Sequence, residues 1–131
     1  MSSSESTSGP RVGLLSQDLM VRSRVAATLA VGGIKLEVLT LDSKPVALDL
    51  LLADLNRGAD ERLAWLERVQ ASGAAGEVIC FGRHTEMAEL NPRALAAGAA
   101  RCVANSHLPV TLGRWLRSRP GGRDSPRRGT A

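Results

Sequence analysis

The segment that most constrains the fold is a nearly unbroken apolar run, DLLLADLN at residues 49–56. A strand that is covered by helices on both faces reads as such a run, because neither face meets water. In parallel sheets, ligands bind beyond the carboxyl ends of the strands. Asp54 lies at that end, and a carboxylate beside apolar neighbours is costly unless it is hydrated, paired or bound to metal. The run therefore predicts a central strand with Asp54 as a functional candidate. The alternative is that Asp54 caps the turn before Gly58.

Length and composition favour one folded domain with an aliphatic core. The chain has 131 residues, 44% of them hydrophobic, and its aromatic residues are Trp65, Phe81 and Trp115. A chain of this size can bury most of its apolar surface without a disulfide or a structural metal. No apolar run approaches the roughly 20 residues of a membrane span, and the first residues lack the basic and apolar regions of a signal peptide. We therefore expect a cytoplasmic protein.

The net charge of +4 comes entirely from the carboxyl-terminal end. Residues 1–116 hold 12 Lys or Arg and 12 Asp or Glu, whereas residues 117–131 hold 5 Arg and 1 Asp. We expect the Ser-rich residues 1–10 to be a disordered leader and the Pro-, Gly- and Arg-rich residues 119–131 to be a disordered basic tail. Residues 11–118 are then the folded domain. The tail could contact phosphates, which keeps a nucleic-acid partner open.

The cysteines and histidines do not have the spacing of a metal site. Cys80 and Cys102 each lie inside a short apolar run, and there is no CxxC motif. His84 and His107 fall in segments of different local character. Buried free cysteines are common core residues, and a reducing compartment keeps them unpaired. We therefore expect both thiols to pack in the core, and we expect no zinc or other metal site.

Hydrophobic periodicity predicts strands that alternate with helices. The expected strands cover 12–15, 34–40, 48–54, 77–81 and 101–104, and the expected helices cover 19–31, 60–71, 85–97 and 109–116. Asn91-Pro92 has the sequence of a cap followed by a first-turn proline, so the helix over 85–97 is expected to be interrupted there. Such alternation is typical of an α/β fold, here a five-stranded parallel sheet doubly wound into a three-layer sandwich.

One connection is too short for a helix. Only nine residues separate Thr40 from Leu50, whereas a parallel crossover takes a dozen or more. The second helix is therefore expected to be missing or reduced to a turn, which would leave part of one sheet face thinly covered. Exposed apolar surface there would suit a protein partner or a second copy of the chain. Alternatively, long side chains or the leader cover it.

From residue 11 to about residue 118 the pattern resembles the receiver domain of bacterial two-component response regulators. Three stretches carry the resemblance. Asp54 in DLLLADLN looks like the phosphoacceptor strand, GAA at 98–100 looks like the GAD or GAA turn, and ANSHL at 104–108 looks like the end of the fifth strand with its Lys-Ser or Lys-Pro step. The resemblance implies a flavodoxin-like receiver fold and makes Asp54 the phosphoacceptor-equivalent residue.

The acidic pair that holds Mg²⁺ in receivers is absent at the matching positions. Ser16 and Gln17 stand there, and Asp18 lies one position too late unless the chain shifts locally. Mg²⁺ prefers hard, negatively charged oxygen ligands and otherwise keeps its waters. We therefore expect no bound Mg²⁺ and no other cofactor.

Two further receiver positions have lost their functional groups. The hydroxyl residue that ends the fourth strand is matched by Gly82, and the lysine that ends the fifth strand is matched by Asn105, which Ser106 follows. Phosphoryl transfer depends on positioning and on electrostatic stabilisation, so a site without the acids, the hydroxyl and the cation lacks the means of catalysis.

The segment after the fourth strand is a second candidate contact. Gly82 is expected to free the backbone, and Arg83 and His84 would then supply donors beside Asp54 and Ser106 for an anion or a protein partner. Alternatively, His84 hydrogen-bonds a loop carbonyl and fixes the next helix.

These features favour a stand-alone degenerate receiver, or pseudo-receiver, that signals through protein–protein contacts or self-association without conventional phosphorylation. Asp54 is then a turn cap or a structural remnant, and by resemblance the partner surface lies on the side of residues 110–116. One alternative is an atypical phosphoacceptor of a two-component phosphorelay, labelled on Asp54. Another is a nucleic-acid-associated protein that acts through its Arg-rich tail. We do not expect an enzyme, because there is no nucleophile with a base, no phosphate-binding glycine loop and no acid pair.

Overall fold

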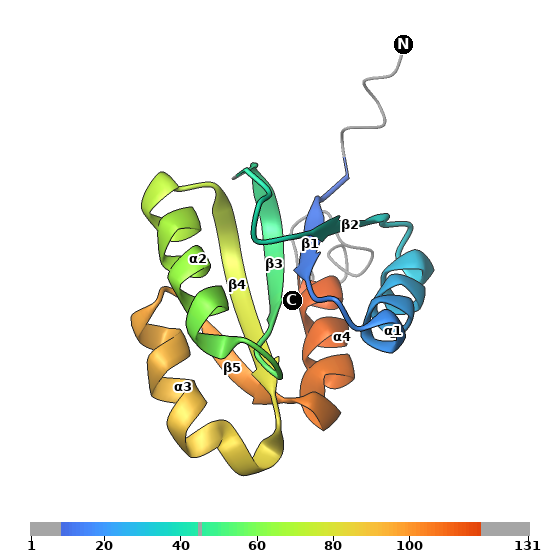
Figure 1. Ribbon diagram of the computed structural model, residues 1–131. Coiled ribbons are helices and arrows are strands. Elements are labelled where there is room, and N and C mark those ends of the chain that lie inside the picture. The colour runs from blue at the N-terminus through green and yellow to red at the C-terminus, as the bar shows by residue number, and fades with distance from the viewer. Residues whose placement is uncertain (1–8, 45, 119–131) are drawn as a thin grey trace, which may run out of the picture.

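Five parallel strands form one sheet in the computed structural model, which describes residues 9–44 and 46–118. The strands are β1 (Val12–Leu15), β2 (Leu36–Leu39), β3 (Leu48–Asp54), β4 (Ala75–Gly82) and β5 (Arg101–Ala104). Their order is β2-β1-β3-β4-β5, and each neighbouring pair is parallel (Figure 1). The predicted sheet is confirmed, with β3 at its centre. Most of the expected leader and all of the expected tail lie outside the described residues.

Four helices in the described part of the chain cover the sheet. They are α1 (Leu19–Val31), α2 (Ala59–Ser72), α3 (Met87–Ala96) and α4 (Leu108–Ser118), and the short 3-10 helices η2 (His84–Glu86) and η3 (Asn105–His107) precede α3 and α4. α1 and α4 lie on one face of the sheet, and α2 and α3 lie on the other (Figure 1). The three-layer sandwich is confirmed. Within these residues no helix combines the length and the apolar character that crossing a membrane requires.

The central strand supplies side chains to the apolar clusters on both faces. Leu50 and Leu52 belong to the cluster under α1 and α4, whereas Leu51 and Ala53 belong to the cluster under α2 and α3. All four side chains are fully buried. The apolar run from Leu50 to Ala53 follows from this double coverage, because none of these positions is free to be polar.

The first helix begins at a side-chain cap. Oδ1 of Asp18 accepts hydrogen bonds from the backbone N–H groups of Met20 (2.8 Å) and Val21 (3.2 Å). These N–H groups have no partner inside the helix, so the carboxylate satisfies them and complements the positive end of the helix dipole. The predicted helix over 19–31 is confirmed, and its cap places Asp18 at the carboxyl end of the sheet.

The expected interruption at Asn91-Pro92 is wrong. α3 runs without a break from Met87 to Ala96 with Pro92 inside it. Proline removes one backbone hydrogen bond, to the carbonyl four residues earlier. That residue is Ala88, which is exposed, so water can hydrate the freed carbonyl. The irregular stretch comes earlier than expected, in the 3-10 turn η2.

The second helix of the expected pattern is missing, as predicted. Within the described residues between β2 and β3 the chain forms no helix. Leu39 and Val46 pack against the cluster under α2 and α3. Beside them Arg11 forms an ion pair with Glu37 (2.8 Å) across the β1–β2 edge. Side chains of the strands and of the link therefore cover part of the face that a helix would otherwise cover.

Candidate functional site

The Asp54 carboxylate is buried and fully hydrogen-bonded. Its side chain ends β3, and the residue is only 3% exposed. Oδ2 accepts a hydrogen bond from the Ser16 hydroxyl (2.6 Å), and Oδ1 accepts from the backbone N–H (2.9 Å) and the side-chain amide (2.7 Å) of Asn56. All three donors are neutral. These bonds replace the water that the carboxylate loses on burial.

The sheet register explains why Ser16 meets Asp54. Leu15 of β1 pairs with Ala53 of β3, so the next residue of each strand emerges at the same edge. Ser16 is 1% exposed, and its hydroxyl oxygen also accepts the backbone N–H of Asp18 (3.1 Å). The bond from Asn56 N–H to the carboxylate two residues earlier is an Asx turn, which reverses the chain directly after the strand.

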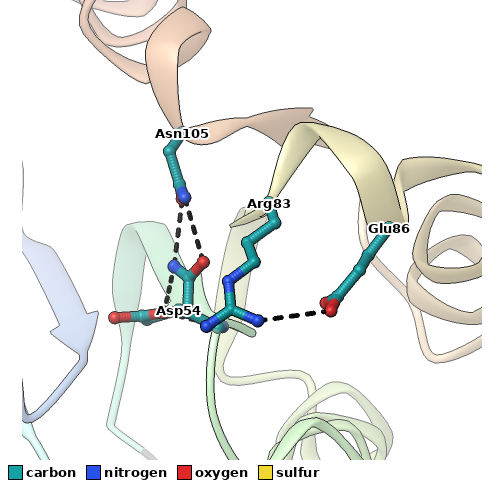
Figure 2. Close-up of polar contacts among 5 residues, drawn as sticks. Asp54, Arg83, Glu86 and Asn105 are labelled. Carbon is teal, nitrogen blue, oxygen red and sulfur yellow. Dashed lines mark hydrogen bonds and ion pairs between the residues drawn. The ribbon is translucent and has the colours of Figure 1, made fainter.

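A pair of asparagine amides connects this network to the end of β5. The side chains of Asn56 and Asn105 exchange two hydrogen bonds, of 3.0 Å and 2.9 Å. Figure 2 shows Asn105 pointing from its own segment toward the group around Asp54. Asn105, which the sequence resemblance matches to the receiver lysine, reaches Asp54 only through Asn56. Neutral amides therefore tie the ends of β3 and β5 together across β4.

The cations nearest to the network bind main-chain carbonyls. Arg62 of α2 is 7% exposed and donates from Nη1 to the backbone oxygen of Asp54 (2.6 Å). Arg22 of α1 donates from Nε to the backbone oxygen of Ser16 (3.1 Å). Among the described residues, the Asp54 carboxylate has no ion-pair partner within 4.0 Å. The two arginines hold the strand ends in place and leave the carboxylate to neutral donors.

An open cavity of about 300 Å³ lies over Asp54. Of the residues noted from sequence, Gln17 and Asp18 line it together with Asp54, and Asn56, Arg57 and Arg62 complete the lining. Asp18 is the second carboxylate of the cavity, and its Oδ1 is already engaged in capping α1. The described residues contain no group of three or more His, Cys, Asp or Glu that could hold a metal ion.

Gly82 gives space to side chains of α3 rather than freedom to the backbone. It lies in β4 and does not have a positive φ, so the expectation that it frees the backbone is wrong. A Cβ at this position would come within 2.9 Å of Leu90 Cδ1 and 3.5 Å of Met87 Cε. The missing side chain lets α3 pack closely on the sheet.

Arg83 and His84 do not join the Asp54 network. The Arg83 side chain is 62% exposed and pairs with Glu86 at 3.5 Å (Figure 2). His84 and Ser106 are exposed, and neither side chain makes a hydrogen bond to another described residue. The alternative in which His84 binds a loop carbonyl is therefore not what this structure shows.

The two cysteines are free and adjacent. Cys80 of β4 and Cys102 of β5 are register partners, Cys80 is buried and Cys102 is partly buried. Burial raises the pKa of the Cys80 thiol to about 12, and it also raises the pKa of Cys102. Both are therefore protonated at neutral pH, as packing residues are.

Three residues of the cavity lining were not found from sequence, namely Asn56, Arg57 and Arg62. The signal for Asn56 was its place two residues after Asp54, the spacing of an Asx turn. Arg62 could have been noticed as a basic residue on the apolar stripe of its helix, next to Leu63. Neither signal indicates what the side chain binds.

The sequence matches no known protein family and no characterised protein. The structure is similar to the chemotaxis protein CheY4 of Vibrio cholerae, with a TM-score of 0.67 and 16% identity over 82% of this chain and 96% of that one. It is also similar to the receiver domain of the Francisella response regulator 1452 (TM-score 0.63, 14% identity, 79% and 90% covered). A LuxR-family two-component response regulator from Aurantimonas sp. SI85-9A1 has 21% identity and a TM-score of 0.59, with 85% and 84% covered. By its fold, this chain is a receiver-like domain.

Proposed function

We propose that this chain is a degenerate receiver that signals through protein–protein contacts, and that Asp54 is a structural carboxylate. The observation that carries the proposal is the use of both Asp54 oxygens. A phosphoacceptor oxygen must turn a lone pair toward phosphorus, whereas here Ser16 donates to one oxygen and Asn56 donates twice to the other. Attack through Oδ2 would disturb the bond from the Ser16 hydroxyl, and attack through Oδ1 would disturb both bonds from Asn56, at the cost of leaving these donors without partners.

The electrostatics of the cavity also support the proposal. Phosphoryl transfer needs cations beside the transferred group. Arg62 binds a main-chain carbonyl, and the position of the receiver lysine holds Asn105, which is neutral. Arg57 also lines the cavity and has no carboxylate partner within 4.0 Å among the described residues, so the charge that would stabilise a phosphoryl group is reduced to this arginine.

The donor set does not fit Mg²⁺. This ion requires near-octahedral oxygen coordination, usually with at least one carboxylate free to bind it. The cavity offers Asp54, whose two oxygens accept three hydrogen bonds, and Asp18, which caps α1. Ser16 and Gln17 contribute no charge. We therefore assign no role to Mg²⁺ and no enzymatic reaction to this site.

The partner surface that we propose includes α4. Val110 is 53% exposed on this helix, and Trp115 and Leu116 are partly buried beside the core. Exposed apolar side chains of this kind are typical of contact surfaces when they lie together. Val110→Asp should abolish a contact with a partner or a second copy without unfolding the domain, which light scattering of the purified chain would detect for self-association.

Labelling with acetyl phosphate and Mg²⁺ tests the central part of the proposal. Intact mass spectrometry should show no phosphorylated species. The matched control is Ser16→Asp/Gln17→Asp/Asn105→Lys, which removes the hydrogen bond from Ser16 to Asp54 Oδ2 and introduces two acids and a lysine, and it should gain a label. A label on the natural chain that disappears in Asp54→Asn would establish the alternative, an atypical phosphoacceptor.

A second groove favours a second candidate function, contact with nucleic acid. Arg101, Arg114, Arg117 and the partly buried Trp115 line this groove beside β5 and α4, together with one acidic residue, Glu77. Arginine and an aromatic ring are the groups that hold a single strand. Fluorescence anisotropy with a single-stranded DNA should then show salt-dependent binding that falls in Arg114→Gln/Arg117→Gln and persists in Arg68→Gln. Loss of binding only on deleting residues 119–131 would assign the contact to the tail instead.

A further inference from the structure

We propose a further binding site, a groove between α1 and α4 that takes a small organic anion with an apolar body. The inference goes beyond the proposed function, since it does not depend on whether Asp54 is phosphorylated. The groove encloses about 360 Å³, which falls within the range of small-molecule sites, about 300–1,000 Å³.

The floor of the groove is apolar. Val25, Phe81, Leu108 and Leu112 are buried side chains of the cluster under α1 and α4, and they also line the groove. Met20 also lines the groove and is 63% exposed. A ligand with an apolar body would remove this surface from water.

The rim of the groove is basic. Arg24 of α1, Arg57 after β3 and Arg83 after β4 all line it, from segments far apart in the sequence. Arg24 and Arg57 have no carboxylate within 4.0 Å among the described residues, and Arg83 has only the 3.5 Å contact with Glu86. The one acidic residue of the lining, Asp18, caps α1.

One helix end adds to this positive potential. α4 begins at the groove and has no acidic residue in its first turn, whereas the Asp18 carboxylate already caps α1. Helix N-termini carry partial positive charge. An anionic group placed among the three arginines would therefore meet donors, while the rest of the ligand covers the apolar floor. Carboxylate, sulfonate and phosphate share this chemistry.

The groove adjoins the cavity over Asp54. Asp18, Asn56 and Arg57 line both, and Asn105 lines the groove. A ligand in the groove would therefore touch the Asn56–Asn105 pair that ties β3 to β5.

The test uses 8-anilinonaphthalene-1-sulfonate and its neutral counterpart N-phenyl-1-naphthylamine, with the full chain in its native state. The sulfonate should bind one-to-one with blue-shifted fluorescence, and the neutral compound should bind about tenfold more weakly, because it cannot form charge-assisted hydrogen bonds. Arg24→Gln/Arg57→Gln should weaken sulfonate binding about tenfold or more. The control Lys35→Gln/Arg68→Gln removes the same charge from exposed positions outside the groove and should not.

Amide shifts locate the bound compound. They should centre on Met20, Phe81, Asn105 and Leu108, and Met20→Gln should weaken binding with native circular dichroism retained. Equal binding of the neutral compound would overturn the proposal in favour of an apolar contact for a protein. Equal weakening of sulfonate binding in both double variants would overturn the proposal in favour of diffuse electrostatic attraction. Amide shifts centred on Trp115 would overturn it in favour of the groove beside β5 and α4. A negative result here would count against the groove alone, because the proposed role of Asp54 is tested separately by labelling with acetyl phosphate.

Discussion

The cavity over Asp54 and the groove between α1 and α4 adjoin each other, yet their polar groups are used in opposite ways. In the cavity, the buried Asp54 carboxylate accepts three hydrogen bonds, and Arg62 and Arg22 are committed to carbonyls. In the groove, Arg24 has no acidic partner within 4.0 Å among the described residues, and neither does Arg57, which lies where the groove meets the cavity. Buried groups that satisfy one another hold a fold together, whereas exposed groups without partners are available to a ligand.

This difference predicts that substitutions in the two regions change the free energy of unfolding by unequal amounts, with the largest loss at Asp54. Asp54→Ala removes the acceptor of three hydrogen bonds and leaves buried donors of Ser16 and Asn56 unpaired, which should lower the free energy of unfolding by about 2–4 kcal/mol. Asp54→Asn keeps one acceptor and should cost less. Arg24→Gln and Arg57→Gln, at exposed positions, should stay within about 0.5 kcal/mol. Urea unfolding followed by tryptophan fluorescence measures all four.

Unchanged or increased stability of Asp54→Ala would contradict the view that the polar groups of the cavity, unlike those of the groove, hold the fold together. A carboxylate that is retained for chemistry often costs stability, so its removal stabilises the fold. That result would reclassify Asp54 as a functional residue held under strain.

Arg62 should give the next largest effect. Arg62→Met keeps the stem of the side chain but leaves the Asp54 carbonyl without its buried donor, at a cost of about 1–3 kcal/mol. Arg68→Met on the same helix is exposed and is the matched control, expected within about 0.5 kcal/mol. Thermal unfolding by circular dichroism compares them. Equal effects of the two substitutions would mean that the Arg62 hydrogen bond contributes nothing measurable.

The side-chain amides of Asn56 and Asn105 should make a smaller contribution to stability than Asp54 or Arg62. A double-mutant cycle with Asn56→Ala and Asn105→Ala should give a coupling energy of about 0.5–1.5 kcal/mol, since each amide donates to the other and both are partly hydrated. Chemical denaturation of the four proteins provides the cycle. Strict additivity would show that the pair does not tie β3 to β5 in solution.

The smallest effect is expected at the sheet edge, in the ion pair of Arg11 and Glu37. The hydrogen bond from Arg11 lowers the pKa of Glu37 below its ordinary value of 4.5. A carboxylate whose pKa is lowered in the folded state stabilises that state at pH values above its ordinary pKa. This stabilisation is lost as the pH falls through the lowered pKa. Carboxyl ¹³C shifts should show Glu37 titrating below 4.5, and Arg11→Gln should move it back. An unshifted pKa in the natural chain would contradict the ion pair.

The sequence allowed most of the fold to be predicted because each element carries a local signal. The run ending at Asp54 indicated the central strand, and the Asp18 cap and Gly32-Gly33 bounded the first helix. Pro92 misled because its local signal is that of a helix start, whereas tertiary packing continues the helix through it. The short link after β2 indicated the missing helix correctly.

The site was only partly predictable, because its contacts are not local. Asn56 and Asn105 are 49 residues apart, and the bond from Ser16 to Asp54 spans 38 residues. Sequence reasoning could note that Ser16 and Asn105 replace charged receiver residues. It could not show that these replacements bond into one neutral network, nor that Arg24, Arg57 and Arg83 converge on an apolar groove.

An NMR titration of the ¹⁵N-labelled chain with Mg²⁺ and then with beryllofluoride tests the structural role of Asp54 most directly. Beryllofluoride mimics a phosphoryl group on a carboxylate that is free to accept one and has Mg²⁺ beside it. We predict no saturable shifts of the amides of Ser16, Asn56 and Asn105 at millimolar Mg²⁺, with or without beryllofluoride. Saturable shifts centred on Asp54 would contradict this and would make the domain a working phosphoacceptor.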